Sequence, residues 1–144
     1  MAQFLTALEI REVAQDRWVL LRPLIYESDV LLIRYSTTWG HTITVPVNFT
    51  TDLESIPRVL PLAYAILYGT AHKASVVHDW LYTNGGLWPT SQLAQSGAHV
   101  TRKQADDVLY EAIVCTGEPR WKAWLIWLGV RAGGWVAWNK HRKV

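Results

Sequence analysis

Two residues of this chain stand out as candidates for chemistry: a histidine in one predicted helix and an aspartate in the next. His78 lies at the edge of an apolar helix face, where an imidazole can act as a general base or a metal ligand. Asp106 lies at the margin of a second apolar face, where a carboxylate needs a partner because burying an unpaired charge is costly. We predict that Asp106 bonds to His78, fixes its tautomer and stabilises the imidazolium. The alternatives are a purely structural histidine, and an aspartate that bonds to the backbone or to an arginine.

A third polar segment, TDLESIPR at residues 51–58, follows a predicted strand. This composition is typical of a turn, in which Asp52 or Ser55 caps a short helical segment. The other interpretation brings Asp52 to the histidine as an oxygen ligand or a charge partner. In that case Ser55 and Arg58 are expected to support the site.

Helical patterns in the second half of the chain are expected to position these residues. The predicted helices cover residues 70–82, 101–116 and about 118–133. Thr101 can cap the second helix, with Gln104 at the capping-box position. On that helix Asp107 and Glu111 fall on the side predicted to face solvent.

The first half of the chain has the patterns of β structure. We predict strands at residues 18–21, 30–35 and 42–45, and an edge strand at 45–49 because proline cannot donate to a β ladder. Strands followed by helices predict a single α+β domain over residues 1–144, with antiparallel strands first and about three helices afterwards. The basic residues at 139–144 are expected to form a flexible tail.

The composition excludes several classes of protein. Half of the 144 residues are apolar and 18% are charged, which is typical of a globular domain. The formal net charge is only +2, concentrated at the C-terminal end, so nucleic acid is not the expected partner. No signal peptide is expected, and the apolar stretch at 123–138 is too short to cross a bilayer.

Taken together, three ordered motifs resemble an uncharacterised family of short phage and prophage proteins. The motifs are TDLESIPR at 51–58, HDWLY at 78–82 and RKQAD at 102–106, and the resemblance covers about residues 45–131. The chain departs from the family by a longer loop at 87–100. The resemblance implies phage structural proteins as partners, and a location in the host cytoplasm or the assembled virion.

The pattern His-Asp-x-x-Tyr followed by a later helical aspartate also resembles the core of phospholipase A2. That resemblance implies that His78 activates a water, Asp79 binds calcium, and Tyr82 and Asp106 support the histidine. The glycine-rich calcium loop and the disulfides of that family are not recognisable here. A divalent cation such as calcium would need about six to eight oxygen ligands, which only Asp52 or backbone carbonyls could complete.

Five tryptophans crowd the C-terminal segment: Trp121, Trp124, Trp127, Trp135 and Trp138. One interpretation is a core helix with one flank covering the sheet and an aromatic rim. The other is an interfacial helix whose tryptophans lie at a lipid headgroup boundary, so that the protein makes peripheral contact with a membrane surface.

Two functional hypotheses follow. The first is a small phage hydrolase, phospholipase- or esterase-like, which uses a His78–Asp106 dyad and a divalent cation. The second is a virion, tail or lysis-cassette accessory protein in which the polar cluster is structural. The hydrolase hypothesis predicts an open cleft at His78 with a cation-binding shell. The accessory protein predicts a sealed cluster and a large tryptophan-rich apolar surface elsewhere.

Overall fold

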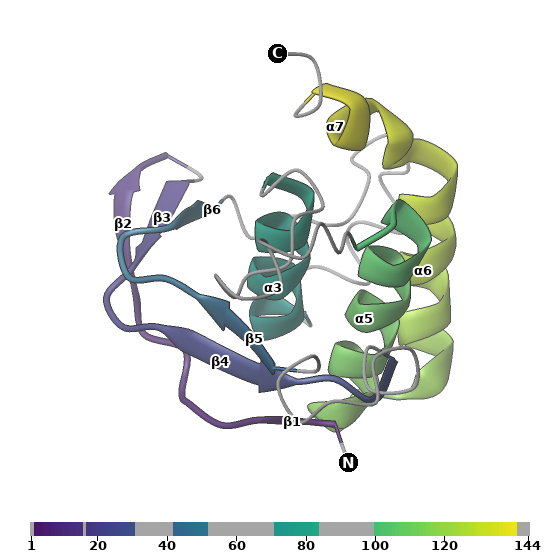
Figure 1. Ribbon diagram of the computed structural model, residues 1–144, viewed down its shortest axis with the longest axis horizontal. Helices are drawn as coiled ribbons and strands as arrows, with labels where there is room; N and C mark the ends of the chain where they lie inside the picture. Colours follow the sequence, from purple (N-terminus) through teal and green to yellow (C-terminus); the bar gives the residue numbers. More distant parts are fainter. Residues whose placement is uncertain (1, 16, 31–41, 52–70, 84–99, 141–144) are drawn as a thin grey trace.

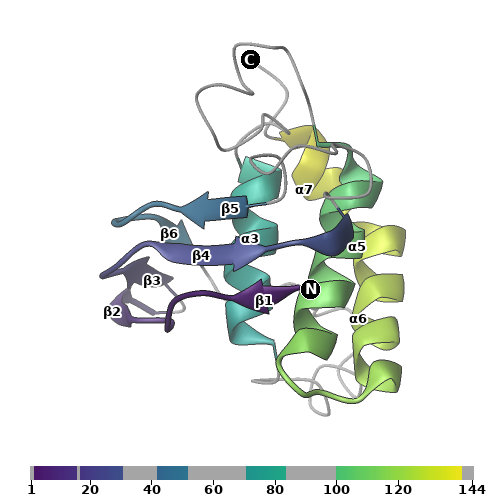
Figure 2. The ribbon, with the colours of Figure 1, turned by 60° about the horizontal axis from the view of Figure 1, so that its bottom comes forward.

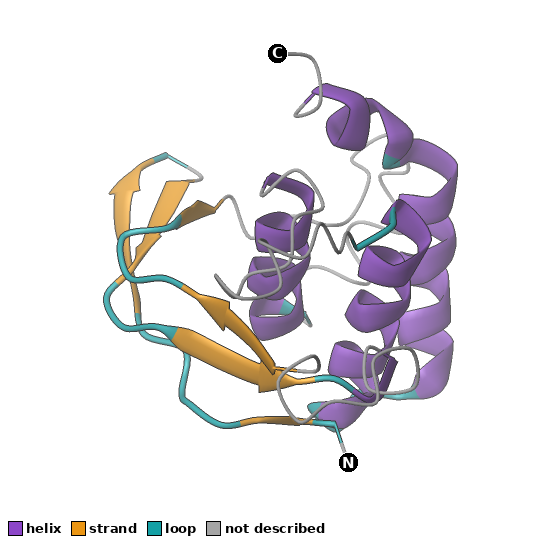
Figure 3. Cartoon of the chain, viewed as in Figure 1, coloured by secondary structure: helices purple, strands orange, loops and turns teal. Residues whose placement is uncertain are grey.

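The computed structural model describes residues 2–15, 17–30, 42–51, 71–83 and 100–140 of the chain. Over these residues the protein is a single α+β domain, with short antiparallel strands first and helices afterwards, as the sequence predicts (Figure 3). The predicted site residues Asp52, Ser55 and Arg58 lie outside the described residues, as does most of the predicted strand at 30–35. Val30 itself is helical, so that strand does not begin where predicted.

The strands form two small antiparallel sheets. They are β1 (Gln3–Phe4), β2 (Ile10–Ala14), β3 (Arg17–Leu20), β4 (Leu24–Glu27), β5 (Thr42–Val45) and β6 (Thr50–Thr51). One sheet has the order β1-β4-β5 and the other the order β2-β3-β6 (Figure 1). The two sheets together form the layer that covers one side of the helices.

The β4–β5 pair contributes the sheet's part of the core. Leu24 pairs with Val45 and Tyr26 pairs with Ile43, and all four side chains are fully buried. Their alternation along each strand places one face against the helices, as expected for an antiparallel sheet with one buried side. The Tyr26 ring also packs against Phe4 of β1, with ring centroids 4.6 Å apart.

Two of the strand predictions are confirmed and one is wrong. The predicted strands at 18–21 and 42–45 correspond to β3 and β5. The predicted edge strand at 45–49 does not form, because β5 ends at Val45 and Asn48 adopts a positive φ of 69°. A positive φ belongs to a turn, and asparagine tolerates it better than most residues.

Four helices follow in the described part of the chain: α3 (His72–Thr83), α5 (Arg102–Cys115), α6 (Arg120–Gly133) and α7 (Trp135–Lys140). The first three confirm the predicted helices. The predicted capping box is also present, because the Gln104 backbone N–H donates to the Thr101 hydroxyl and the Thr101 N–H donates to the Gln104 side chain.

The helices form successive layers behind the strands. In both ribbon views α3 lies next to the strands, α5 lies beyond α3, and α6 is the outermost helix (Figures 1 and 2). The prediction that the C-terminal helix covers the sheet is therefore wrong: α6 packs on α5 through Ala123, Ile126 and Val130. The predicted tail begins within α7, which ends at Lys140.

The junction between α6 and α7 depends on a small residue at position 134. A Cβ added to Gly134 would lie 2.6 Å from the Tyr82 hydroxyl oxygen and would collide with the carbonyl oxygen of Val130. A Cβ added to the neighbouring Gly133 would meet nothing within 4 Å. The close approach of α7 to Tyr82 therefore requires glycine at 134 alone.

We predict that Gly134→Ala lowers the free energy of unfolding by about 1–3 kcal/mol, because the methyl group overpacks this contact. Gly133→Ala is the matched control. It should leave stability unchanged or raise it by up to about 1 kcal/mol through its helix propensity. Chemical denaturation of both variants tests this, and equal effects at the two positions would contradict the close contact.

Candidate functional site

The carboxylate of Asp106 is the centre of a buried polar cluster. Its Oδ1 atom accepts hydrogen bonds from His78 Nε2 at 2.8 Å and from the Tyr82 hydroxyl at 2.6 Å. Its Oδ2 atom accepts one from Arg131 at 2.9 Å, and the Arg102 guanidinium lies 3.8 Å away. The predicted contact between His78 and Asp106 is thus present. The arginine alternative is present as well, because the same carboxylate serves both partners.

Helices α3, α5 and α6 supply the polar groups of this cluster. His78 and Tyr82 are one turn apart on α3, so both side chains project from the same face towards α5. Their rings are in contact, with centroids 4.2 Å apart. Trp138 of α7 packs edge-on against the other side of Tyr82, with ring centroids 5.1 Å apart. The aromatic contacts restrict the orientation of both α3 side chains.

The electrostatics of the cluster favour an ionised Asp106. Burial alone would raise the pKa of this carboxyl, but hydrogen bonds from His78, Tyr82 and Arg131 outweigh it, and the pKa is lowered. Burial, followed by the hydrogen bond to Asp106, raises the pKa of the Tyr82 hydroxyl. An ionised carboxylate can only accept hydrogen bonds, so His78 Nε2 must be the donor.

This contact selects the tautomer of the neutral imidazole. With the proton of the neutral ring on Nε2, the lone pair is on Nδ1, and Nδ1 is the basic atom. Both partners lie deep in the protein, since His78 is 4% exposed and Asp106 is fully buried. The sequence predicts His78 at the edge of an apolar face, whereas the structure places it inside the core.

The predicted cation site has one candidate ligand among the described residues. Asp79 follows His78 on α3, and its carboxylate accepts a 2.6 Å hydrogen bond from Thr51 of β6. Within the described ranges no group of three or more histidine, cysteine, aspartate or glutamate side chains is arranged to hold a metal ion. The second predicted carboxylate ligand, Asp52, lies outside the described residues.

Two arginines that complete the cluster were not predicted from the sequence. Arg102 and Arg131 hold α6 to α5, because Arg102 also donates to the carbonyl oxygens of Val130 and Arg131 at 3.2 and 3.3 Å. The spacing of Arg102 and Asp106, four residues apart on one helix, was a signal for their ion pair. Nothing in the local sequence indicated that Arg131 reaches Asp106.

The predicted environment of Glu111 is wrong. This residue was predicted to face solvent, but its carboxylate accepts hydrogen bonds from Tyr26 and Ser28 at 2.8 Å and from the Val30 backbone at 3.0 Å. Glu111 therefore joins α5 to the end of β4. Asp107 is only partly exposed, and it pairs with Lys103 and accepts a hydrogen bond from Trp127.

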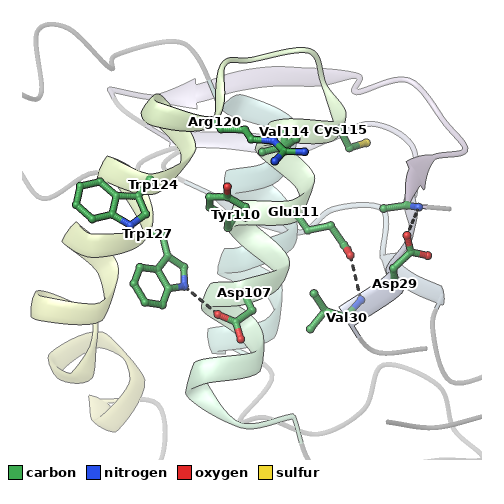
Figure 4. Close-up of a pocket in the computed structure, with 11 residues that line it drawn as sticks. Asp29, Val30, Asp107, Tyr110, Glu111, Val114, Cys115, Arg120, Trp124 and Trp127 are labelled. Carbon is green, nitrogen blue, oxygen red and sulfur yellow. Dashed lines mark hydrogen bonds between the residues drawn. The ribbon is translucent and has the colours of Figure 1, made fainter. Parts of the chain in front are cut away.

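Glu111 and Asp107 line an open groove of about 1050 Å³ between α5, α6 and the chain after β4 (Figure 4). Trp124 and Trp127 form its α6 side, and Trp127 points at Asp107. Neither His78 nor Asp106 lines this groove. The groove and the polar cluster are therefore separate features of the molecule.

The fold and the cluster define a small α+β domain built around a buried histidine–aspartate pair. The chain belongs to DUF1353, a family described as a protein of unknown function, whose model matches residues 18–130. No curated protein and no solved structure significantly matches the chain.

The lowered pKa of Asp106 predicts how stability depends on pH. A depressed carboxyl pKa adds stability above the pKa of the unfolded state, about 3.9 for aspartate. That stability is lost as the pH falls from this value through the lower folded pKa. At neutral pH, Asp106→Asn should cost on the order of 3 kcal/mol, because it leaves Arg131 without its carboxylate. The difference from wild type should shrink below about pH 4.

Asp107→Asn is the matched control for this measurement. Asp107 lies next in the sequence and pairs with Lys103 near the surface, so its loss should cost less than about 1 kcal/mol. Urea denaturation of the three proteins across the acidic range gives the comparison. A penalty for Asp106→Asn that stays constant with pH would contradict the ionised buried carboxylate.

Proposed function

We propose that the protein is a small hydrolase in which His78 is the general base and Asp106 its supporting carboxylate. The observation that carries this proposal is the 2.8 Å contact between His78 Nε2 and Asp106, because it makes Nδ1 the basic nitrogen. Tyr82 bonds to the same carboxylate oxygen. The phospholipase A2 resemblance assigns the same supporting role to the equivalent tyrosine and aspartate, and it points to a carboxylic ester as substrate.

In the proposed reaction, Nδ1 of His78 takes a proton from a water molecule as the water oxygen attacks the ester carbonyl carbon. The ring then carries a positive charge, which the Asp106 carboxylate stabilises. The proton next passes to the leaving alkoxide, so the products are a carboxylic acid and an alcohol. Arg131 and Tyr82 keep Asp106 ionised and oriented throughout.

A divalent cation, with calcium as the first candidate, is a separate part of this proposal. Asp79 is the described residue that would contribute an oxygen ligand, with Asp52 as the second carboxylate. The cation would polarise the ester carbonyl. Because Asp79 already accepts a hydrogen bond from Thr51, binding would have to replace or share that contact.

A second candidate function is favoured by the burial of the cluster. With His78 at 4% exposure and Asp106 at zero, the polar groups also fit a structural network that clamps α3, α5 and α6 together. On this proposal the protein is an accessory component of a phage particle or lysis cassette. The sequence resemblance to phage and prophage proteins supports that setting for either function.

The hydrolase proposal predicts that His78→Gln folds but loses activity. The glutamine side-chain amide can still donate to Asp106, so the cluster keeps its hydrogen bond while the basic nitrogen is removed. We expect turnover of a fluorogenic phospholipid or a short-chain ester to fall by about 10²–10⁴-fold. His72→Gln, at an exposed position on the same helix, is the matched control and should retain full activity.

A calcium titration of the same proteins completes this experiment. If calcium raises both the turnover and the melting temperature of wild type, but neither quantity in Asp79→Asn, the result would support a calcium site at Asp79. Absence of turnover in wild type with either substrate, with and without calcium, would overturn the hydrolase. So would full turnover in His78→Gln.

The accessory proposal predicts that the protein is present in assembled particles. Mass spectrometry of phage particles purified from an induced lysogen that carries the gene should then detect it at a defined ratio to the capsid protein. Its absence from the particles, together with normal particle yield and host lysis after deletion of the gene, would overturn the accessory role.

A further inference from the structure

Helix α6 is apolar on two opposite sides. Its buried side consists of Ala123, Ile126 and Val130, which pack on α5. At roughly 100° per residue, a second set of exposed apolar residues lies on the opposite side of the helix, and one of them, Trp124, also lines the groove described above. This set comprises Trp121, Trp124, Leu125 and Leu128. A single-layer surface helix needs only one apolar side, so the second side calls for a partner.

The second apolar side is exposed, and the following helix, α7, exposes apolar side chains as well. Trp121 and Trp124 are each 53% exposed, and Trp135 of α7 is 55% exposed. Leu125, Leu128 and Val136 are also exposed. We call these six residues the apolar face. The ribbon views place α6 outermost, on the side of α5 away from the strands, so the apolar face is on the outside of the molecule (Figures 1 and 2).

The C-terminal segment that carries the apolar face is positively charged. From residue 120 to the C-terminus the sequence contains six lysines and arginines and no aspartate or glutamate. The net charge of the whole chain is only +2, so the preceding part of the chain is net negative. Arg120 and Lys122 lie on opposite flanks of the apolar face, each roughly 100° from Trp121 on the helix. Lys122 pairs with Glu118 and Arg131 pairs with Asp106, so Arg120 and Lys140 are the described cations considered for contact with a partner.

We propose that the apolar face docks the protein on the surface of an anionic lipid bilayer. Exposed tryptophan and leucine flanked by cations is the composition of helices that lie in the membrane interface. No helix in the described ranges has the length and apolarity needed to span a membrane, so docking would be peripheral. The tryptophan indoles would lie at the headgroup level, with Arg120 and Lys140 near lipid phosphates.

The positive charge of the C-terminal segment argues against a second copy of the chain as the partner of the apolar face. A two-fold contact through the apolar face would set the net positive C-terminal segments of two copies against each other. Like charges facing each other across an interface oppose association. An anionic bilayer would bury the apolar side chains and attract the cations at the same time. This docking does not depend on the proposed hydrolase activity.

Vesicle co-sedimentation tests the proposal directly. The probes are vesicles of phosphatidylcholine alone and of phosphatidylcholine mixed with phosphatidylglycerol. The test variant is Leu125→Gln/Leu128→Gln, and the matched control is Leu5→Gln/Leu21→Gln, which changes two exposed leucines at the strands. We expect wild type and the control to bind anionic vesicles equally, and the test variant to bind about tenfold more weakly. Added salt should weaken binding.

Several results would overturn the proposal. These are failure of wild type to bind anionic vesicles, equal binding to both vesicle types, and equal loss of binding in the test and control variants. Sedimentation velocity without lipid tests the remaining alternative, which is a second copy of the chain bound at the apolar face. A dimer that the test variant abolishes would show that the apolar face binds a second copy instead. Because the readout is binding, His78→Gln should bind as wild type does, which separates this inference from the hydrolase proposal.

Discussion

The structure depends on one buried negative charge. Asp106 is fully buried, and an unpaired carboxylate at such a position would cost several kcal/mol. Hydrogen bonds from His78 and Tyr82 of α3 and from Arg131 of α6 compensate that cost. These hydrogen bonds join α3 and α6 to α5 at a single carboxylate, so Asp106 ties the three helices together. The glycine at 134 is part of the same arrangement, because it lets α7 approach Tyr82.

The same contacts serve structure and chemistry at once. A carboxylate that is kept ionised by an arginine and a tyrosine holds its histidine in one tautomer, which is the property that a general base requires. The burial of the pair equally suits a structural clamp. The two proposed functions therefore share one geometry, and they differ in whether Nδ1 of His78 meets a substrate. The apolar face lies on the side of α6 opposite to the one that packs on α5, so the proposed docking on a membrane is compatible with either function.

Local sequence signals predicted the helices and the contact at the centre of the site. The capping box at Thr101 and the position of Asp106 at the margin of an apolar face are properties of consecutive residues, and both predictions are confirmed. Strands of two to five residues, such as β1 and β2, carry too little periodicity to be recognised. Arg131 and the partners of Glu111 were missed because no local pattern marks Arg131 as a partner of Asp106 or Glu111 as an acceptor for the end of β4. Burial of the C-terminal helix was overestimated, since apolar periodicity does not distinguish a core from an exposed face that binds a partner.

The central claim is that Asp106 makes Nδ1 of His78 the basic nitrogen. The most direct measurement is ¹⁵N NMR of the His78 imidazole in the neutral form of the ring, with Asp106→Asn as the comparison. We expect a proton on Nε2 and none on Nδ1 in wild type, and a loss of this preference in the variant. A neutral ring protonated on Nδ1 in wild type would contradict the account, because the carboxylate of Asp106 could then not be accepting a hydrogen bond from Nε2.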